Sequence, residues 1–191
     1  MDTSLTPARP TRLRWLPNAL TIARLAALPV LLVVLLRAEG PTSVLGGVIF
    51  GVVGATDLLD GYLARRLDAE TRFGRIADPL ADRLLVGVGL IGVIALGQVN
   101  PAAPVILIVR DVLTIVGFAW LLRRGVEMRV DMAGKVSSAL TMVAAGGAML
   151  FEGRWISVLM WLAVALALAT LANYIRIAAL RLRAAETSTR P

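Results

Sequence analysis

The chain has 191 residues, of which 58% are hydrophobic and only 17% are charged. A soluble domain carries about 25% charged residues, so the excess apolar surface is expected to face lipid. The sequence contains no Cys and no His, which excludes disulfides, thiolate chemistry and a histidine base. In a membrane protein, the net charge of +7 is typical of cytoplasmic loops and of contacts with anionic lipid, so we predict no nucleic-acid partner.

The first segment, residues 1–18, is basic and lacks the short apolar stretch and small-residue cleavage site of a signal peptide. We interpret it as retained in the mature protein. Residues 9–18 are expected to form a short interfacial helix, with Trp15 at the level of the lipid head groups.

Six apolar stretches follow, each close to the roughly 20 residues that a membrane-spanning helix needs. Short polar or Gly- and Pro-containing turns separate them. The stretches cover residues 19–36, 43–65, 75–97, 104–124, 133–151 and 156–181. The sequence therefore predicts an all-α integral membrane protein with one domain over 1–191, made of the N-terminal segment, a six-helix transmembrane bundle at 19–181 and a cytoplasmic tail at 182–191.

The distribution of Arg and Lys predicts the orientation of this bundle. Six spans place both termini on one side, and that side carries most of the basic residues between and beyond the spans. The opposite side carries only Arg37 and Arg154. Because positive loops stay in the cytoplasm, both termini and the turn between the second and third spans are expected to be cytoplasmic. High Ala, Arg, Leu and Val content suggests a GC-rich bacterium, and hence its inner (plasma) membrane.

Four aspartates flank the turn between the second and third predicted spans. Asp57 and Asp60 lie at i, i+3 near the end of the second span, and Asp78 and Asp82 lie at i, i+4 near the start of the third. Either spacing puts both side chains on one helical face, and a hairpin connection can turn the two faces toward each other. The sequence thus predicts an acidic cluster at the cytoplasmic end of this helix pair.

Carboxylates at the edge of a bilayer require neutralisation, because a charge at the membrane centre costs at least about 2.5–3.5 kcal/mol. Oxygen-rich clusters suit hard cations such as Mg²⁺, Mn²⁺ or Ca²⁺. Two such ions could clamp a diphosphate and stabilise its leaving oxygen. A single acidic pair at a helix end is usually a solvated cap, but four acids in register favour a functional site.

Small residues and one arginine accompany the acids. Gly61 and Ala64 would let a backbone or ligand approach closely, Arg65 could reach a phosphate, and Gly74 interrupts the turn before the third span. Together these positions resemble the signature of the CDP-alcohol phosphotransferase family, D-x2-D-G-x2-A-R-x8-G-x3-D-x3-D, and every fixed position of it is present. The six-span layout extends the resemblance over nearly the whole chain.

The resemblance implies a reaction and roles for these residues. A phosphatidyl group would pass from CDP-diacylglycerol to an alcohol, with release of CMP. Asp57, Asp60 and Asp78 would be the main ligands of two divalent cations, Mg²⁺ or Mn²⁺. Asp82 would contribute to the metal site and remove the acceptor's proton, and a carboxylate base also suits a chain without His. The residues lining the CDP site would be Gly61, Ala64, Arg65 and Gly74. Such proteins are often homodimers.

The amino-acid sequence of the motif segment resembles most closely those of bacterial phosphatidylglycerophosphate synthases and cardiolipin synthases. Arg24 also has a counterpart in these two branches. The glycerophosphate enzymes resemble one another in a run R-E-F-x-V-T-x-L-R and a later G-K-x-K-T. Arg110 and Lys135 match those runs, whereas Phe118 and Ser137 replace basic residues. Glycerol 3-phosphate is a small dianion that needs several cationic donors, so phosphatidylglycerol is narrowly favoured as acceptor, with glycerol 3-phosphate as the alternative.

Three basic residues are candidates for binding the acceptor: Arg110, Lys135 and Arg176. Arg176 is the weaker candidate, and the other two also have a simpler interpretation. Arg110 could sit beside Asp111 in a structural network, and Lys135 could extend to lipid phosphates. Arg24 could be ordinary cytoplasmic charge, and Tyr174 is expected to serve in packing.

Two other classes of function remain open at this point. Transporters also bury carboxylates near their substrates, although this chain shows no internal duplication and its acids gather at one turn. A non-catalytic membrane scaffold would have no reason to keep four charges that are costly to insert. Metal-dependent release of CMP from CDP-diacylglycerol would distinguish the enzyme from both.

Overall fold

The computed structural model describes residues 16–67, 74–124 and 131–188, with side chains described within 22–56, 81–124 and 131–182. The secondary structure of this described part is entirely helical, as predicted. Its six helices are α1 (Leu16–Leu36), α2 (Val44–Leu67), α3 (Gly74–Leu96), α4 (Ala102–Arg123), α5 (Met132–Leu150) and α6 (Arg154–Ser188).

The observed helix bounds agree closely with the apolar stretches of the sequence. For α1 to α5, each end lies within three residues of the predicted span. The last helix differs, because α6 continues through Ser188 and includes residues that were expected to belong to a tail from residue 182. The interfacial helix predicted at 9–18 falls mostly on residues outside the described part.

Two of these helices are long and apolar enough to cross a bilayer, α4 over Ala102–Arg123 and α6 over Arg154–Leu182, when the described residues are considered. Shorter apolar stretches cover Ile22–Leu36 and Val44–Thr56. The stretch in α2 ends at Thr56, which is the last residue of that helix whose side chain is described. The prediction of six membrane spans is therefore supported for two helices and is not confirmed for the other four.

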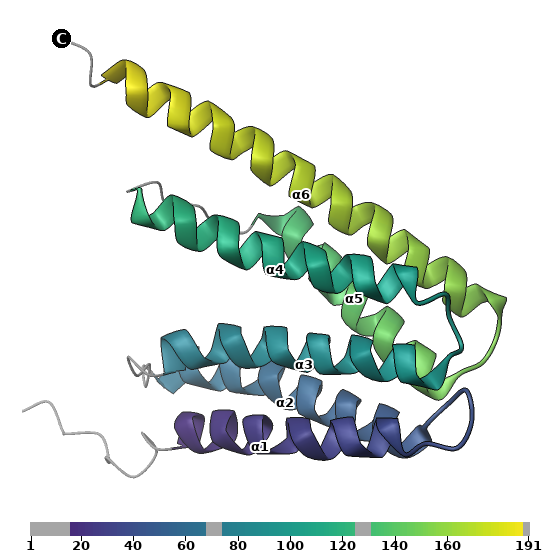
Figure 1. Ribbon diagram of the computed structural model, residues 1–191. Coiled ribbons are helices and arrows are strands. Elements are labelled where there is room, and N and C mark those ends of the chain that lie inside the picture. Colours follow the sequence, from purple (N-terminus) through teal and green to yellow (C-terminus); the bar gives the residue numbers. More distant parts are fainter. Residues whose placement is uncertain (1–15, 68–73, 125–130, 189–191) are drawn as a thin grey trace, which may run out of the picture.

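The helices form two groups, α1–α3 and α4–α6, which contact each other mainly where α3 packs against α4 and α5. Helix α1 packs against α2 and α3, while α6 packs against α4 and α5, and α3 also contacts α4 and α5. Figure 1 shows α6 inclined to the first three helices, so that the groups approach each other at one end of the molecule and separate toward the other. Fully buried side chains between the helices include Leu31, Leu35, Leu85, Leu90, Leu107 and Met149.

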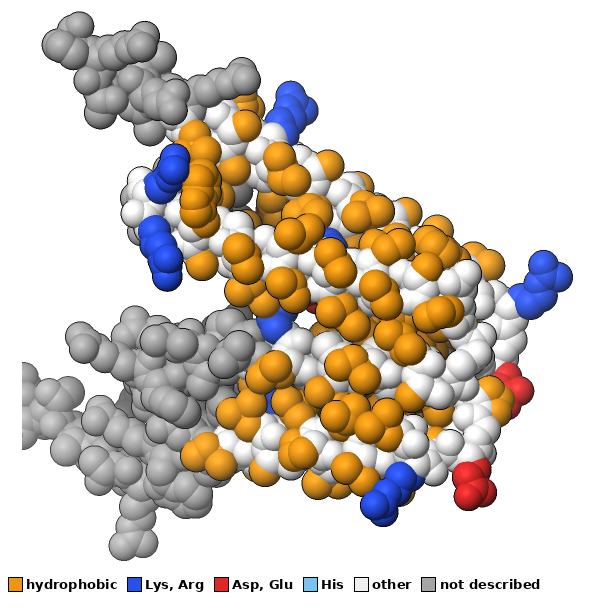
Figure 2. All heavy atoms as spheres, in the orientation of Figure 1, with side chains coloured by type: hydrophobic (Ala, Val, Ile, Leu, Met, Phe, Trp, Pro, Cys, Tyr) orange, Lys and Arg blue, Asp and Glu red, His pale blue; other side chains and the backbone are white. Residues whose placement is uncertain are grey.

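The outer surface of the bundle is also apolar. Large hydrophobic side chains are more than half exposed on α4 and α6, including Val112, Val116, Val158 and Leu162. Figure 2 shows hydrophobic atoms spread over the helix faces. Exposed apolar surface of this extent marks contact with a membrane or another protein.

Glycines bring the first three helices close together. A Cβ atom at Gly89 of α3 would lie 2.5 Å from Cε2 of Phe50 in α2. A Cβ atom at Gly92 would meet Leu35 of α1 even more closely. The absence of a side chain at these positions therefore lets both neighbouring helices pack against the backbone of α3.

The three short turns of the described chain lie at the end where the two helix groups meet (Figure 1). The backbone N–H of Ser43, before α2, donates to the carbonyl of Met149 at 2.8 Å. The side-chain amide of Gln98 donates to the carbonyl of Phe151 at 2.6 Å. Gly97 and Gly153 adopt positive φ angles of 70° and 135°, which turn the chain after α3 and before α6. The motif lies at the other end.

Candidate functional site

The acidic motif lies on two helices, as predicted. Helix α2 continues to Leu67 and α3 begins at Gly74, so both aspartate pairs have the helical spacing that puts their members on one face. The two helices also contact each other. Of the predicted metal and CDP residues, only Asp82 has a described side chain. The side chains outside the described part are those of Asp57, Asp60, Gly61, Ala64, Arg65, Gly74 and Asp78, so their convergence stays a prediction.

Asp82 lies beside a buried arginine. Its carboxylate Oδ1 is 3.6 Å from Nη1 of Arg24 in α1, and 46% of the Asp82 side chain is exposed, against 3% for Arg24. Arginine is rarely buried unless it is paired. Arg24 is therefore not simply one of the exposed basic residues of the cytoplasmic side. Its side chain is buried between α1 and α3, next to Asp82, the predicted base.

A second charged cluster begins at the residue after Asp82. Nη1 of Arg83 in α3 and Nη1 of Arg110 in α4 each donate a 2.8 Å hydrogen bond to the same Oδ1 atom of Asp111. The exposed fraction of the side chain is 27% for Arg83, 17% for Asp111 and 4% for Arg110. The sequence indicated no role for Arg83, because the pairing of Arg83 with Asp111 depends on how α3 packs on α4.

Arg110 also contacts α6. Its Nε donates to the carbonyl of Ala167 at 3.2 Å, and its Nη2 donates to the Thr170 hydroxyl at 2.7 Å. Three nitrogen atoms of the guanidinium group are thus engaged with protein oxygens. This geometry fits the structural network that the sequence allowed as an alternative, and the role of Arg110 in binding an acceptor stays a prediction.

The other two candidate acceptor residues are exposed. Lys135 lies in the first turn of α5 and Arg176 lies near the end of α6 that is remote from the short turns. Neither residue is buried, so both side chains are free of the packing constraints that hold Arg110. Their predicted contacts with an acceptor remain untested by this arrangement.

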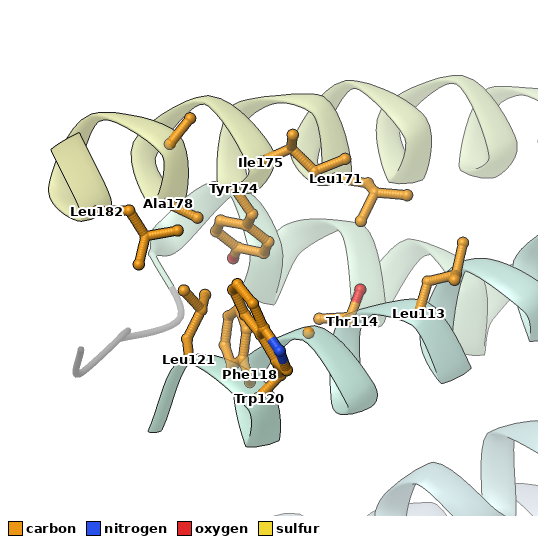
Figure 3. A pocket seen from close by; sticks show the side chains of 12 residues that line it. Leu113, Thr114, Phe118, Trp120, Leu121, Leu171, Tyr174, Ile175, Ala178 and Leu182 are labelled. Carbon is orange, nitrogen blue, oxygen red and sulfur yellow. The ribbon is translucent and has the colours of Figure 1, made fainter. Parts of the chain in front are cut away.

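An apolar groove of about 290 Å³ lies between α4 and α6. Figure 3 shows Phe118 and Tyr174 facing each other in it, and their ring centroids are 5.5 Å apart in an edge-to-face arrangement. The Tyr174 hydroxyl donates at 2.9 Å to Asp131, which precedes α5. Tyr174 therefore packs, as expected, and also forms a hydrogen bond that the sequence did not indicate.

Phe118 and Ser137 stand where similar glycerophosphate enzymes have basic residues, and the structure shows their surroundings. Phe118 lines the apolar groove, and Ser137 is completely buried in α5. Phe118 follows Arg110 by eight residues on the same helix, which is about 12 Å along the axis. Position 118 is therefore well separated from the Arg110 cluster, so its lack of charge leaves that cluster intact.

Comparison with known proteins gives consistent matches. The family pattern described as CDP-alcohol phosphatidyltransferase matches residues 14–169. The chain is 34% identical over 129 residues to a Rickettsia bellii protein named CDP-diacylglycerol–glycerol-3-phosphate 3-phosphatidyltransferase, with 68% of this chain and 71% of that protein covered. A Bacillus subtilis protein of the same name is 33% identical over 148 residues, covering 71% and 76%. A Mycobacterium tuberculosis protein named probable phosphatidylglycerophosphate synthase is 36% identical over 139 residues, covering 71% and 66%.

Proposed function

Because this chain belongs to the CDP-alcohol phosphatidyltransferase family, we propose that it transfers the phosphatidyl group from CDP-diacylglycerol to glycerol 3-phosphate and releases CMP. The names of the Rickettsia bellii and Bacillus subtilis relatives, each similar over more than two thirds of this chain, support this choice of both substrates. The family membership also sets aside the transporter and scaffold alternatives.

The choice of acceptor reverses the preference drawn from the sequence. That preference for phosphatidylglycerol rested on Phe118 and Ser137, which lack the positive charge expected for binding a dianion. Phe118 packs against Tyr174 in an apolar groove, and Ser137 is buried. The lack of charge at these two positions therefore does not show how many cationic side chains lie near Asp82. The relatives' names support glycerol 3-phosphate instead.

The donor set of the motif fits a divalent metal centre. Four aspartates supply the oxygen ligands that Mg²⁺ and Mn²⁺ prefer, and their spacing on α2 and α3 is helical. In this proposal Asp57, Asp60, Asp78 and Asp82 hold two cations, which would neutralise the diphosphate and its leaving oxygen. Asp82, with nearly half of its side chain exposed, takes the proton from the acceptor hydroxyl.

The remaining roles follow the motif. Gly61, Ala64, Arg65 and Gly74 line the site for the CDP group, and Lys135 and Arg176 are candidates for contact with the acceptor. The apolar outer faces of α4 and α6 support a location in a membrane. We propose the bacterial inner membrane, with the motif on the cytoplasmic side, on the distribution of Arg and Lys along the sequence. A homodimer is proposed on the resemblance alone.

One assay tests this function. Purified protein in lipid nanodiscs would receive CDP-diacylglycerol and Mg²⁺ or Mn²⁺, with glycerol 3-phosphate, phosphatidylglycerol or inositol phosphate offered separately. We expect CMP release and phosphatidylglycerophosphate formation with glycerol 3-phosphate only, both abolished by a metal chelator and restored by added metal. Cardiolipin from phosphatidylglycerol, with glycerol 3-phosphate left unused, would show that the proposed acceptor is wrong.

A further inference from the structure

Arg83 is a partly exposed cation for which the motif provides no role. It directly follows Asp82 in α3, and Nη1 of its guanidinium group donates to Asp111 of α4 at 2.8 Å. Because neighbouring residues on a helix point in different directions, α3 presents Asp82 toward Arg24 of α1 and Arg83 toward α4. The two side chains therefore leave α3 at adjacent positions, each next to a different neighbouring helix.

The cluster around Arg83 carries an excess of positive charge. Arg83 and Arg110 contribute two positive charges and Asp111 contributes one negative charge, which leaves a net charge of +1 among three side chains that are each less than one third exposed. Excess charge in a partly desolvated position favours an ion of opposite sign. Figure 2 shows basic side chains in the hollow between the two helix groups. Because 27% of the Arg83 side chain is exposed, a small anion can reach it.

Asp111 and Arg110 hold Arg83 in place. Arg110 is fixed on its other side by the Ala167 carbonyl and the Thr170 hydroxyl of α6. It in turn fixes the Asp111 oxygen that receives Arg83. An arginine has five N–H donors in a planar fork, and the contact with Asp111 engages one nitrogen of Arg83. The rest of the fork matches the paired oxygens of a phosphate group.

We propose that Arg83 binds the phosphate group of the acceptor and so selects a small phosphorylated alcohol, with Asp111 as its positioning residue. This inference rests on the proposed function. A short acceptor would place its hydroxyl at Asp82 and its phosphate at Arg83, which are adjacent in α3. Arg83 also supplies positive charge that the sequence lacks at positions 118 and 137.

The inference is tested by replacing Arg83 and measuring both binding and kinetics. Arg83→Gln leaves Asp111 paired with Arg110, so the fold is expected to survive, which thermal unfolding would verify. We expect the KM for glycerol 3-phosphate to rise about tenfold or more, since charge-assisted hydrogen bonds are lost, while the KM for CDP-diacylglycerol stays unchanged. Arg83→Lys should recover part of the loss. Arg37→Gln, at the opposite end of the bundle, is the matched control.

Asp111→Asn tests the positioning role, because it retains an oxygen acceptor but removes the charge that orients Arg83. Its KM for glycerol 3-phosphate should rise less than that of Arg83→Gln. A merely structural Arg83 would instead lower kcat or thermal stability and leave that KM unchanged, and this result would overturn the inference.

Direct binding of glycerol 3-phosphate, measured calorimetrically without CDP-diacylglycerol, separates this inference from the proposed function. Binding that is lost in Arg83→Gln supports the role of Arg83 even if the wild-type protein consumes only phosphatidylglycerol, in which case the proposed function alone fails. Equal binding by the wild type and Arg83→Gln overturns the role of Arg83 while the proposed function stands. Absence of binding by the wild type overturns the inference.

Discussion

The Tyr174 hydroxyl of α6 and the backbone N–H of Gly134 donate to the same oxygen of Asp131, at 2.9 Å and 2.8 Å. Asp131 thereby caps the N-terminus of α5 and joins it to α6. Both bonds stabilise the ionised carboxylate, so the pKa of Asp131 is lowered below its ordinary value of 3.8, first by the Gly134 N–H and then by Tyr174.

This lowered pKa predicts a loss of stability in acid. A carboxylate whose pKa is lower in the folded state stabilises the fold above its ordinary pKa of 3.8, and the contribution disappears as pH falls through the lowered value. The melting temperature in detergent should therefore fall less steeply below about pH 4 in Asp131→Asn than in the wild type. Tyr174→Phe, which retains the ring contact with Phe118, should have an intermediate slope. Identical slopes in all three proteins would contradict the role of Asp131.

Asp82→Asn tests the proposed base. The amide cannot accept the acceptor's proton, so phosphatidyl transfer should fall below detection, while CDP-diacylglycerol binding, measured with the labelled lipid, should largely survive. Glu152→Gln, at the end of the bundle with the short turns, controls for removal of a negative charge. Wild-type turnover by Asp82→Asn would show that another group accepts the proton.

Arg110 connects α4 to α6, so its removal should destabilise the protein. Arg110→Ala leaves Asp111 with one of its two arginine partners and removes the donors to Ala167 and Thr170. Loss of the hydrogen bonds made by the buried guanidinium group should cost about 1.5–3 kcal/mol, which thermal unfolding in detergent would detect. Arg123→Ala, on an exposed site of the same helix, should change stability by less than about 0.5 kcal/mol. If Arg110 served only to bind the acceptor, its loss would raise KM and leave the melting temperature unaltered.

Gly92→Ala should weaken the packing of α1 on α3. The added methyl group would collide with Leu35, whose Cβ atom would also lie 3.0 Å away, so rotation of the leucine tip cannot relieve the contact. Overpacking of this kind costs about 1–3 kcal/mol. Gly87→Ala is the matched control on the same helix, because no atom of a neighbouring helix lies within 4 Å of its added Cβ. Equal melting temperatures for the two variants would contradict the close approach of α1 and α3.

Sequence patterns predicted the helices well because each bundle helix needs a long apolar stretch, and the turns carry Gly, Pro or charge. The ion pair between Arg24 and Asp82 and the pair between Arg83 and Asp111 were not predicted, since each joins helices whose packing has no local signal. The end of α6 was also placed too early, because polar residues past Arg181 continue the helix.

The acceptor prediction shows a different limit of the sequence. Alignment with the short basic runs treated Phe118 and Ser137 as lost cations, but a one-dimensional match cannot show that position 118 faces Tyr174. It also cannot show that Arg83, 27 positions earlier than Arg110, contacts the same carboxylate as that residue. The convergence of the four aspartates was predicted from helical spacing, and the helical part of that argument is confirmed.

At the end with the short turns, the Gln98 side chain after α3 donates to the Phe151 carbonyl after α5, and the backbone N–H of Ser43 before α2 donates to the Met149 carbonyl of α5. Motion at that end would break these hydrogen bonds, so it is disfavoured. We expect the bundle to widen or narrow mainly where α6 leans away from α1, α2 and α3 (Figure 1). We expect a lipid to enter sideways there, directly from the leaflet in which it is dissolved, without first passing through water.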